Sequence, residues 1–305
     1  MSKGLVDLQL NGAFGVDFNG HWTDEDWIYI NHSLADHGYQ TALATVITDD
    51  FDRMCDRIKR LAKAISDSPT SPVIKGIHVE GPFLSDQVGY VGAHPAKQTR
   101  DAKLDTAKRL INSGGGHVKI LTLAPERDSK GAVTQWLSER GVIVSAGHTN
   151  ASLDEIDACI DNGMSMVTHF GNACPAVMPR HNNILNRLIS RSVHLNFGLI
   201  ADGHHIPNFL LNQWLKILPD EQTFIVSDSI MAGGMPAGEY TLGKQKVIKH
   251  VDASTWNSTG EHFMGSATLL NEMERHLVNE LELSPKRAKT LCQDNPQRIL
   301  GDPGN

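Results

Sequence analysis

Three residues of metal-binding types each follow a short apolar segment of this sequence. They are Glu80 after Val73–Val79, His148 after Val142–Ala146 and His169 at the end of Met166–Thr168. One carboxylate and two imidazoles form the ligand set of a catalytic divalent metal that keeps a position open for water. A single histidine at a strand end is more often a hydrogen-bonded structural residue. Three ligands at the same end of their strands favour a metal site.

Further polar residues with chemical potential stand near these three. Asp228 follows the segment Thr223–Val226, where a carboxylate could serve as the general base beside a metal-activated water. Without a metal, an aspartate capping the next turn would be the better interpretation. Arg180 and His205 are candidate anion contacts, because Arg presents a planar fork of donors that suits phosphate. Taken alone, either could be an ordinary surface residue.

These side chains need a scaffold that brings strand ends together, and the pattern of elements provides one. Apolar, β-branched runs that end in turn residues predict eight strands: Leu5–Leu10, Thr41–Ile47, Val73–Val79, Val118–Leu123, Val142–Ala146, Met166–Thr168, Leu195–Ile200 and Thr223–Val226. Helical spacing lies between them at Asp24–His37, Asp52–Ser66, Leu104–Ser113, Lys130–Arg140, Ser152–Asn162 and Pro207–Leu218. Strand and helix therefore alternate along the chain.

Eight alternating units predict an α/β fold, a (β/α)8 TIM-type barrel, whose catalytic groups gather at the carboxyl ends of the strands. The rival is an open doubly wound sheet, but the phosphate-binding pattern G-x-G-x-x-G is missing after the first strand. We expect residues 1–305 to form a single barrel domain. Gly233–Gly265 is expected to be irregular, and two final helices, near Ala267–Leu281 and Pro285–Leu291, complete the chain.

Composition excludes several classes of function. The 305 residues include 28 Lys and Arg against 35 Asp and Glu, for a net charge of −7, so a nucleic-acid partner is not expected. No apolar run approaches the ~18 residues of a membrane span, and the first residues reach Asp7 before a signal-peptide core can form, so we expect no signal peptide. The four cysteines, Cys55, Cys159, Cys174 and Cys292, are scattered without a C-x-x-C pair. We therefore expect a cytoplasmic protein with reduced thiols.

A series of short motifs along the chain resembles the amidohydrolase superfamily and, within it, the N-acetylglucosamine-6-phosphate deacetylase family. The motifs extend over nearly the whole sequence: Val6-Asp7-Leu8-Gln9-Leu10-Asn11-Gly12, His78-Val79-Glu80-Gly81-Pro82-Phe83-Leu84, Gly92-Ala93-His94, Leu123-Ala124-Pro125-Glu126, Gly147-His148-Thr149-Asn150-Ala151, Thr168-His169, Asn172-Ala173, Ala201-Asp202-Gly203-His204-His205, Ser227-Asp228 and Gly265-Ser266-Ala267. Each motif is short. Agreement of all of them in one order is what makes the resemblance specific.

The resemblance implies a role for each matching residue. It implies Glu80, His148 and His169 as metal ligands and Asp228 as the catalytic acid and base. Many amidohydrolases carry His-x-His on the first strand, and Gln9 and Asn11 stand there instead, which resembles the single-metal arrangement, with Gln9 near the metal-water position. The substrate contacts that it implies are Ala93, His94, Asn172, Ala173, Arg180, His205, Phe263, Met264 and Gly265.

The implied reaction is hydrolysis of N-acetylglucosamine 6-phosphate to glucosamine 6-phosphate and acetate. The cofactor would be one divalent metal. We expect Zn²⁺, although Fe²⁺, Co²⁺ or Mn²⁺ also suits such ligands. The partner would be the small amino-sugar phosphate, with no nucleic acid and no membrane, and the resemblance also suggests a homodimer.

Departures from the family keep alternatives open. We expect both halves of the small β-sandwich domain common in the family to be absent from this sequence. Met178–Asn183 replaces the usual Arg-Glu-Pro-Gly stretch, although Arg180 keeps its spacing from His169. Cys174 stands where Met is common. The substrate could therefore be N-acetylgalactosamine 6-phosphate or that of another amidohydrolase. A non-catalytic sugar-phosphate binding protein is the third hypothesis.

Overall fold

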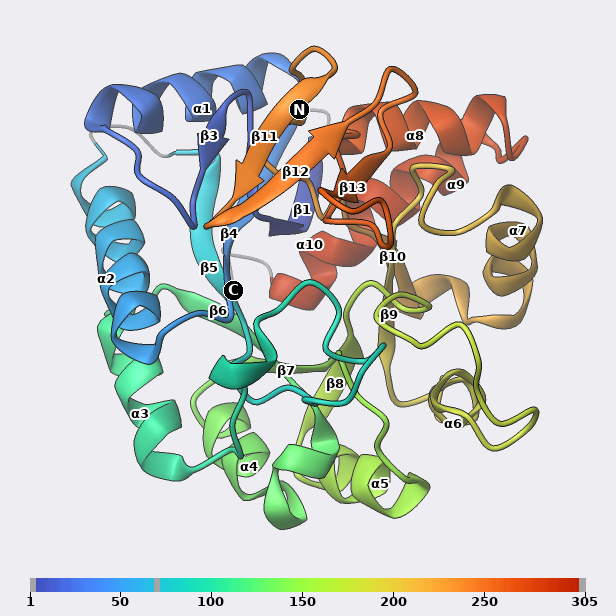
Figure 1. Ribbon diagram of the computed structural model, residues 1–305. Coiled ribbons are helices and arrows are strands. Elements are labelled where there is room, and N and C mark those ends of the chain that lie inside the picture. Colours follow the sequence, from blue (N-terminus) through green and yellow to red (C-terminus); the bar gives the residue numbers. More distant parts are fainter. Residues whose placement is uncertain (1–3, 69–71, 302–305) are drawn as a thin grey trace.

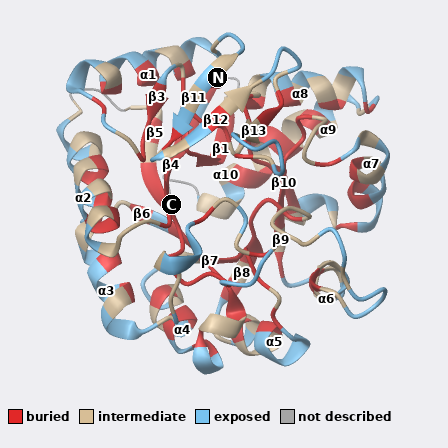
Figure 2. Ribbon diagram, viewed as in Figure 1, coloured by how far each residue is buried: buried red, intermediate tan, exposed pale blue. Residues whose placement is uncertain are grey.

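Eight parallel strands form the centre of the molecule in this computed structural model, which describes residues 4–68 and 72–301. In sheet order the strands are β1 (Leu5–Leu10), β4 (Tyr39–Ile47), β5 (Ile74–Glu80), β6 (Val118–Leu123), β7 (Ile143–Ala146), β8 (Met164–Val167), β9 (Asn196–Leu199) and β10 (Thr223–Ile225). Their side chains are almost all buried, as expected of parallel strands that helices cover (Figure 2). All eight predicted strands are present, with small differences at their ends.

Helices surround this sheet and follow one another around it in chain order (Figure 1). They are α1 (Asp24–Asp36), α2 (Phe51–Asp67), α3 (Leu104–Ser113), α4 (Ala132–Ser138), α5 (Leu153–Asp161), α6 (Ile184–Ile189), α7 (Asn208–Ile217), α8 (Leu270–Asn279), α9 (Pro285–Lys289) and α10 (Asn295–Leu300). Thr23 and Ser152 begin α1 and α5 with reciprocal capping boxes. The prediction of a (β/α)8 TIM-type barrel is confirmed. Among the described helices, none is long and apolar enough to cross a membrane.

The barrel closes between its first and last strands only near their carboxyl ends. There the Asp228 amide donates to the Gln9 carbonyl (3.0 Å) and the Asn11 amide donates to the Ser229 carbonyl (2.8 Å). Nearer the amino ends, the final segment of the chain, Thr290–Leu300, packs against β1 and β10. The seam therefore depends on the last turns of the chain, which fill the space that strand pairing would occupy in a fully closed barrel.

The expectation of an irregular segment at Gly233–Gly265 was wrong. Its residues form a three-stranded antiparallel sheet of β11 (Gly238–Leu242), β12 (Gln245–Lys249) and β13 (Thr255–Asn257). A two-residue turn joins β11 to β12, with Gly243 at φ +59°, a conformation that favours glycine. On these two strands only Leu242 and Val247 are buried, so the apolar alternation that usually reveals a strand is nearly lost.

Two small features complete the described fold. A pair of two-residue strands, β2 (Gly12–Ala13) and β3 (Val16–Asp17), follows β1. Helix α6 was not among the predicted helices, since it is a six-residue element inside a polar loop. Across residues 4–68 and 72–301 the sheets are the eight-, three- and two-stranded ones, so the small β-sandwich is not found in that part of the chain.

Candidate metal centre and its pocket

The three predicted ligands meet at the carboxyl ends of their strands. Glu80 is the last residue of β5, while His148 and His169 each lie two residues beyond a strand. Glu80 Oε1 is 3.0 Å from His148 Nε2 and 2.8 Å from His169 Nε2, and the two imidazole nitrogens are 3.1 Å apart. All three side chains are buried, and their ligand atoms lie within 4.8 Å of one another. This set fits a divalent metal.

Backbone strain accompanies these positions. His148, His169 and Asp228 have φ values of 51°, 31° and 47°, in the left-handed region that non-glycine residues seldom occupy. Such conformations are unfavourable by roughly 1–3 kcal/mol each and tend to cluster at functional sites. Here each one lies two or three residues beyond a strand, where the chain bends so that the side chain joins the cluster.

The charges within the cluster suit a cation. Burial would raise the pKa of Glu80, but contacts with His148, His169 and His94 outweigh it and hold the pKa well below its ordinary value. Burial lowers the pKa of His148 to about 4, and His94 adds to the shift. The Nδ1 of His148 faces the Tyr90 carbonyl at 3.0 Å and therefore carries a proton. Its Nε2 is left with a lone pair directed at the cluster, as a metal ligand requires.

Asp228 lies beside the ligands and is held by two amide side chains, one on β1 and one on the residue directly after β1. Asn11 Nδ2 donates to Asp228 Oδ1 at 2.7 Å, and Gln9 Nε2 donates to the same oxygen at 3.1 Å. Gln9 Nε2 also lies 3.3 Å from Glu80 Oε2, so it links the two carboxylates. Burial raises the pKa of Asp228 to about 6, and the charge of Glu80 contributes.

A pocket of about 650 Å³ opens over this cluster. Of the residues with expected roles, it is lined by Glu80, Ala93, His94, His148, His169, Asn172, Ala173, His205, Asp228, Phe263 and Gly265. Residues 4–68 contribute Asn11 and Ile47, and the three-stranded sheet with its following loop adds Leu242, Trp256, Glu261 and His262. The structure thus brings most of the expected site residues around one cavity.

Three expected contacts lie outside the lining. Arg180 is exposed on the loop that precedes α6, and the described lining residues include no Lys or Arg. Met264 is buried in a small apolar cluster with Ile230 and Val247. Gln9 lies behind the metal ligands, fully buried, where the Thr168 hydroxyl donates to its side-chain oxygen.

Sequence reasoning did not single out the residue that holds His205. Asp202 Oδ2 lies 2.7 Å from His205 Nδ1, and Asp202 Oδ1 accepts from the amides of His204 and His205 at 2.9 Å each. Burial opposes ionisation of Asp202, but His205 and these amides lower its pKa below the ordinary value. The ring of His205 packs against Phe263, with centroids 4.9 Å apart. The spacing of Asp202 and His205 after β9 is the sequence feature that could have predicted this pair.

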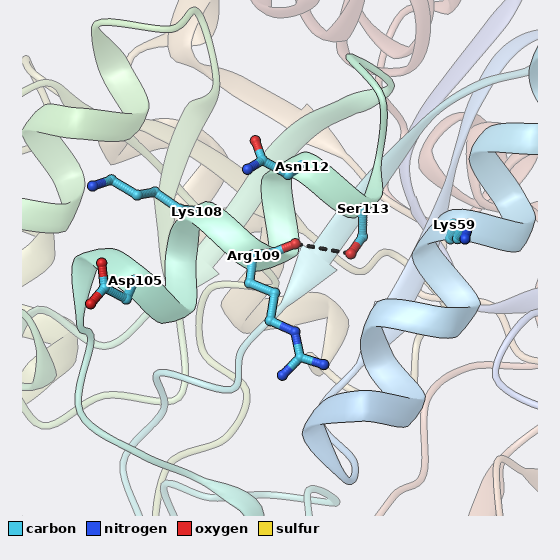
Figure 3. A pocket seen from close by; sticks show the side chains of 6 residues that line it. All are labelled: Lys59, Asp105, Lys108, Arg109, Asn112 and Ser113. Atoms are coloured by element: carbon cyan, nitrogen blue, oxygen red, sulfur yellow. Dashed lines mark hydrogen bonds between the residues drawn. The ribbon is translucent and has the colours of Figure 1, made fainter.

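A second hollow, of about 540 Å³, lies on the surface between α2 and α3 and shares no residue with the pocket. It is lined by Lys59, Asp105, Lys108, Arg109, Asn112 and Ser113. Figure 3 shows the side chains of Asp105 and Lys108 directed away from Arg109. Arg109 is itself exposed and paired with Asp52 at 2.5 Å. This hollow lacks the convergence of groups seen at the barrel mouth.

Comparison with known proteins gives one consistent result. No protein-family model matches the chain. It is 29% identical to the N-acetylglucosamine-6-phosphate deacetylase of Bos taurus over 310 residues, which cover 99% of this chain and 74% of the relative. The enzyme of that name from Bacillus subtilis is 27% identical over 302 residues, covering 98% and 74%.

Solved structures agree with these relatives. A mutant N-acetyl-D-glucosamine-6-phosphate deacetylase from Mycobacterium smegmatis, in complex with N-acetyl-D-glucosamine-6-phosphate, superposes with a TM-score of 0.89 at 27% identity. The match covers 98% of this chain and 77% of that one. The likeness in sequence and in structure therefore extends over almost every residue of the present chain.

Proposed function

Because this chain belongs to the N-acetylglucosamine-6-phosphate deacetylase family, we propose that it hydrolyses the acetamide of an N-acetylhexosamine 6-phosphate. N-acetylglucosamine 6-phosphate is the first candidate substrate. The products are acetate and the free amino sugar phosphate. The observation that supports this most strongly is the convergence of Glu80, His148, His169 and Asp228 at the floor of one pocket. A protein that only bound the sugar would not need that set.

One divalent metal, Zn²⁺ in our proposal, would be held by Glu80, His148 and His169. When bound, such a metal supplies Lewis-acid chemistry toward an amide and makes water more acidic. These ligands bring one negative charge from Glu80 and two imidazoles, so the site retains a net positive charge when it is loaded. That charge suits an amide oxygen that becomes negative during attack.

Asp228 moves the proton in this proposal. Its carboxylate accepts a proton from the attacking water as the carbon–oxygen bond forms, and returns it to the nitrogen as the carbon–nitrogen bond breaks. Burial raises the pKa of Asp228 above its ordinary value, which favours a group that has to accept a proton and then return it. The amide groups of Asn11 and Gln9 both donate to Oδ1 of Asp228, which leaves the second oxygen for the proton transfer.

The sugar would lie in the pocket between the loop of Ala93 and His94 and the loop of Phe263 and Gly265. Its phosphate would meet His205 and the Asn172–Ala173 turn, with Arg180 as a further contact only if its loop moves toward the pocket. Since the described lining includes no Lys or Arg, an N-acetylated amino sugar without phosphate is the second candidate substrate.

The test is acetate release by zinc-loaded protein. N-acetylglucosamine 6-phosphate, N-acetylgalactosamine 6-phosphate and N-acetylglucosamine are compared side by side. If one of the phosphorylated sugars has the highest kcat/KM, the proposal is supported and the preferred epimer is identified. The KM of the Arg180→Ala variant for that sugar then tests whether Arg180 contacts the phosphate. Preference for the unphosphorylated sugar favours the second candidate. Silence on all three, with metal present, would refute both.

A further inference from the structure

The wall of the pocket beside Glu80 is apolar. Ile47 is the last residue of β4 and pairs in register with Glu80, the last residue of β5. Register partners on neighbouring strands point their side chains to the same face of the sheet, and the strands lie about 4.8 Å apart. Because Glu80 faces the ligand cluster, Ile47 borders that cluster from the adjacent strand, and both residues line the pocket.

Leu242, the last residue of β11, extends this wall. It belongs to the small apolar cluster of Ile47, Met264 and Val247, apart from the main core of the barrel. Figure 1 shows the turn of the β11–β12 hairpin close to β4, the strand that carries Ile47. Only 7% of Ile47 and 4% of Leu242 are exposed, yet both residues line the pocket. They therefore present an aliphatic surface to a ligand that enters it.

Hydrogen bonds close to Leu242 fix this surface. The next residue, Gly243, donates its amide hydrogen to Oδ2 of buried Asp17 at 2.7 Å. Gln245 donates from Nε2 to the Ala93 carbonyl at 2.7 Å, which ties the hairpin to the loop after β5. Because the turn is bonded to two separate parts of the barrel mouth, a ligand cannot push Leu242 aside without breaking polar contacts.

The wall lies across the barrel mouth from the residues expected to meet the sugar phosphate. In the order of strands around the barrel, β4 is second and β8 is sixth of eight, so the two strands are opposite each other. The Asn172–Ala173 turn follows β8, and His205 follows β9. An N-acyl amino sugar whose phosphate reaches that side, and whose amide oxygen faces the metal ligands, directs its acyl chain toward Ile47 and Leu242.

We propose that Ile47 and Leu242 form the acyl subsite and limit the acyl group of the substrate to acetyl. A longer chain would have to displace aliphatic side chains that are already packed and anchored. The inference rests on the proposed function and names the feature of its substrate that these two residues select. It also gives the antiparallel sheet a role, because Leu242 comes from β11.

The test compares the N-acetyl, N-propanoyl and N-butanoyl forms of glucosamine 6-phosphate as substrates of the zinc-loaded protein, by release of the free acid. The variants are Leu242→Ala and Ile47→Val. Val247→Ala is the matched control, since Val247 is buried in the same cluster but is not among the described lining residues. Circular dichroism confirms that each variant is folded, and Ile47→Val, the smaller change, carries the comparison if Leu242→Ala is not.

Wild type should lose at least about tenfold in kcat/KM from acetyl to butanoyl, the low end of the discrimination that one methylene gives in a hydrophobic pocket. Leu242→Ala should narrow that difference at least about tenfold, and Ile47→Val should narrow it for propanoyl. Val247→Ala should keep the wild-type ratio. Equal kcat/KM for all three substrates in wild type would overturn the proposal. An unchanged ratio in both pocket variants would overturn it too, as would equal narrowing in Val247→Ala.

Binding supplies a readout that does not need turnover. Calorimetry with zinc-loaded Asp228→Asn protein, with and without Leu242→Ala, gives the Kd of the N-acetyl and N-butanoyl sugar phosphates. The ratio of the two Kd values should narrow at least about tenfold when Leu242→Ala is added. Narrowing without acid release by wild type would leave the proposal standing and refute the proposed function, whereas acid release with unchanged ratios would do the reverse. Protein that neither binds nor hydrolyses these sugars would contradict both.

Discussion

Replacement of Asp7 by Asn should make the protein more stable at alkaline pH. Asp7 lies fully buried at the seam between β1 and β10, where its Oδ1 accepts from the amides of Gln9 and Ser227 at 3.2 Å each. Its Oδ2 has no partner in the described structure. Burial raises the pKa of Asp7 from 3.8 to about 7, despite these hydrogen bonds.

The sign and size of the effect follow from proton linkage. The folded state binds the Asp7 proton more tightly than the unfolded chain, so the free energy of unfolding falls as pH rises from about 4 to about 7. At 1.36 kcal/mol for each pKa unit, ionised Asp7 destabilises the fold by about 4 kcal/mol above pH 8. Between pH 5 and pH 8 the loss is about 2–3 kcal/mol. Asn keeps the accepting oxygen and carries no charge.

Urea unfolding followed by circular dichroism at pH 5 and pH 8, with a chelator present to remove metal, measures this difference. The advantage of Asp7→Asn over wild type should grow by about 2–3 kcal/mol between the two pH values. Asp56→Asn, an exposed change on α2, should show no such trend. An advantage that is equal at both pH values would show that the fold does not raise the pKa of Asp7.

Three further predictions concern the site. Asp228→Asn should keep stoichiometric metal but lose about 10²–10⁴-fold in kcat, and undiminished turnover would remove Asp228 from proton transfer. Asp202→Asn should raise KM more than it lowers kcat, because it loosens the hold on His205, so a loss confined to kcat would contradict that positioning role. Gly92→Ala should weaken zinc binding in a chelator titration, since the new Cβ meets the His148 ring at 2.9 Å, and an unchanged Kd would show that the loop yields freely.

The barrel and its ligand set could be predicted because both depend on short-range patterns. Buried parallel strands are continuous apolar runs, and a polar residue that ends such a run must lie at the same rim as the others. Glu80, His148 and His169 therefore follow from sequence once the eight strands are found. Asp228 follows for the same reason, being placed just after β10.

Other features depend on packing that no local pattern reveals. The β11–β12 hairpin buries only Leu242 and Val247, so it lacks the alternation that marks a strand. Arg180 keeps its spacing from His169, but spacing along a loop does not fix direction, and the side chain is exposed. The approach of His94 to the ligands depends on a loop that Gln245, distant in sequence, holds in place.

Metal-dependent acetate release is the direct test of whether Glu80, His148 and His169 form a catalytic metal centre. Apo protein is titrated with Zn²⁺ in the presence of N-acetylglucosamine 6-phosphate, for wild type and for His169→Ala. Wild-type activity should rise from zero and saturate at one metal per chain, while His169→Ala, folded by circular dichroism, should stay inactive at the same zinc concentration. Full activity in excess chelator, or wild-type activity in the His169 variant, would contradict the assignment of this cluster as the catalytic metal centre.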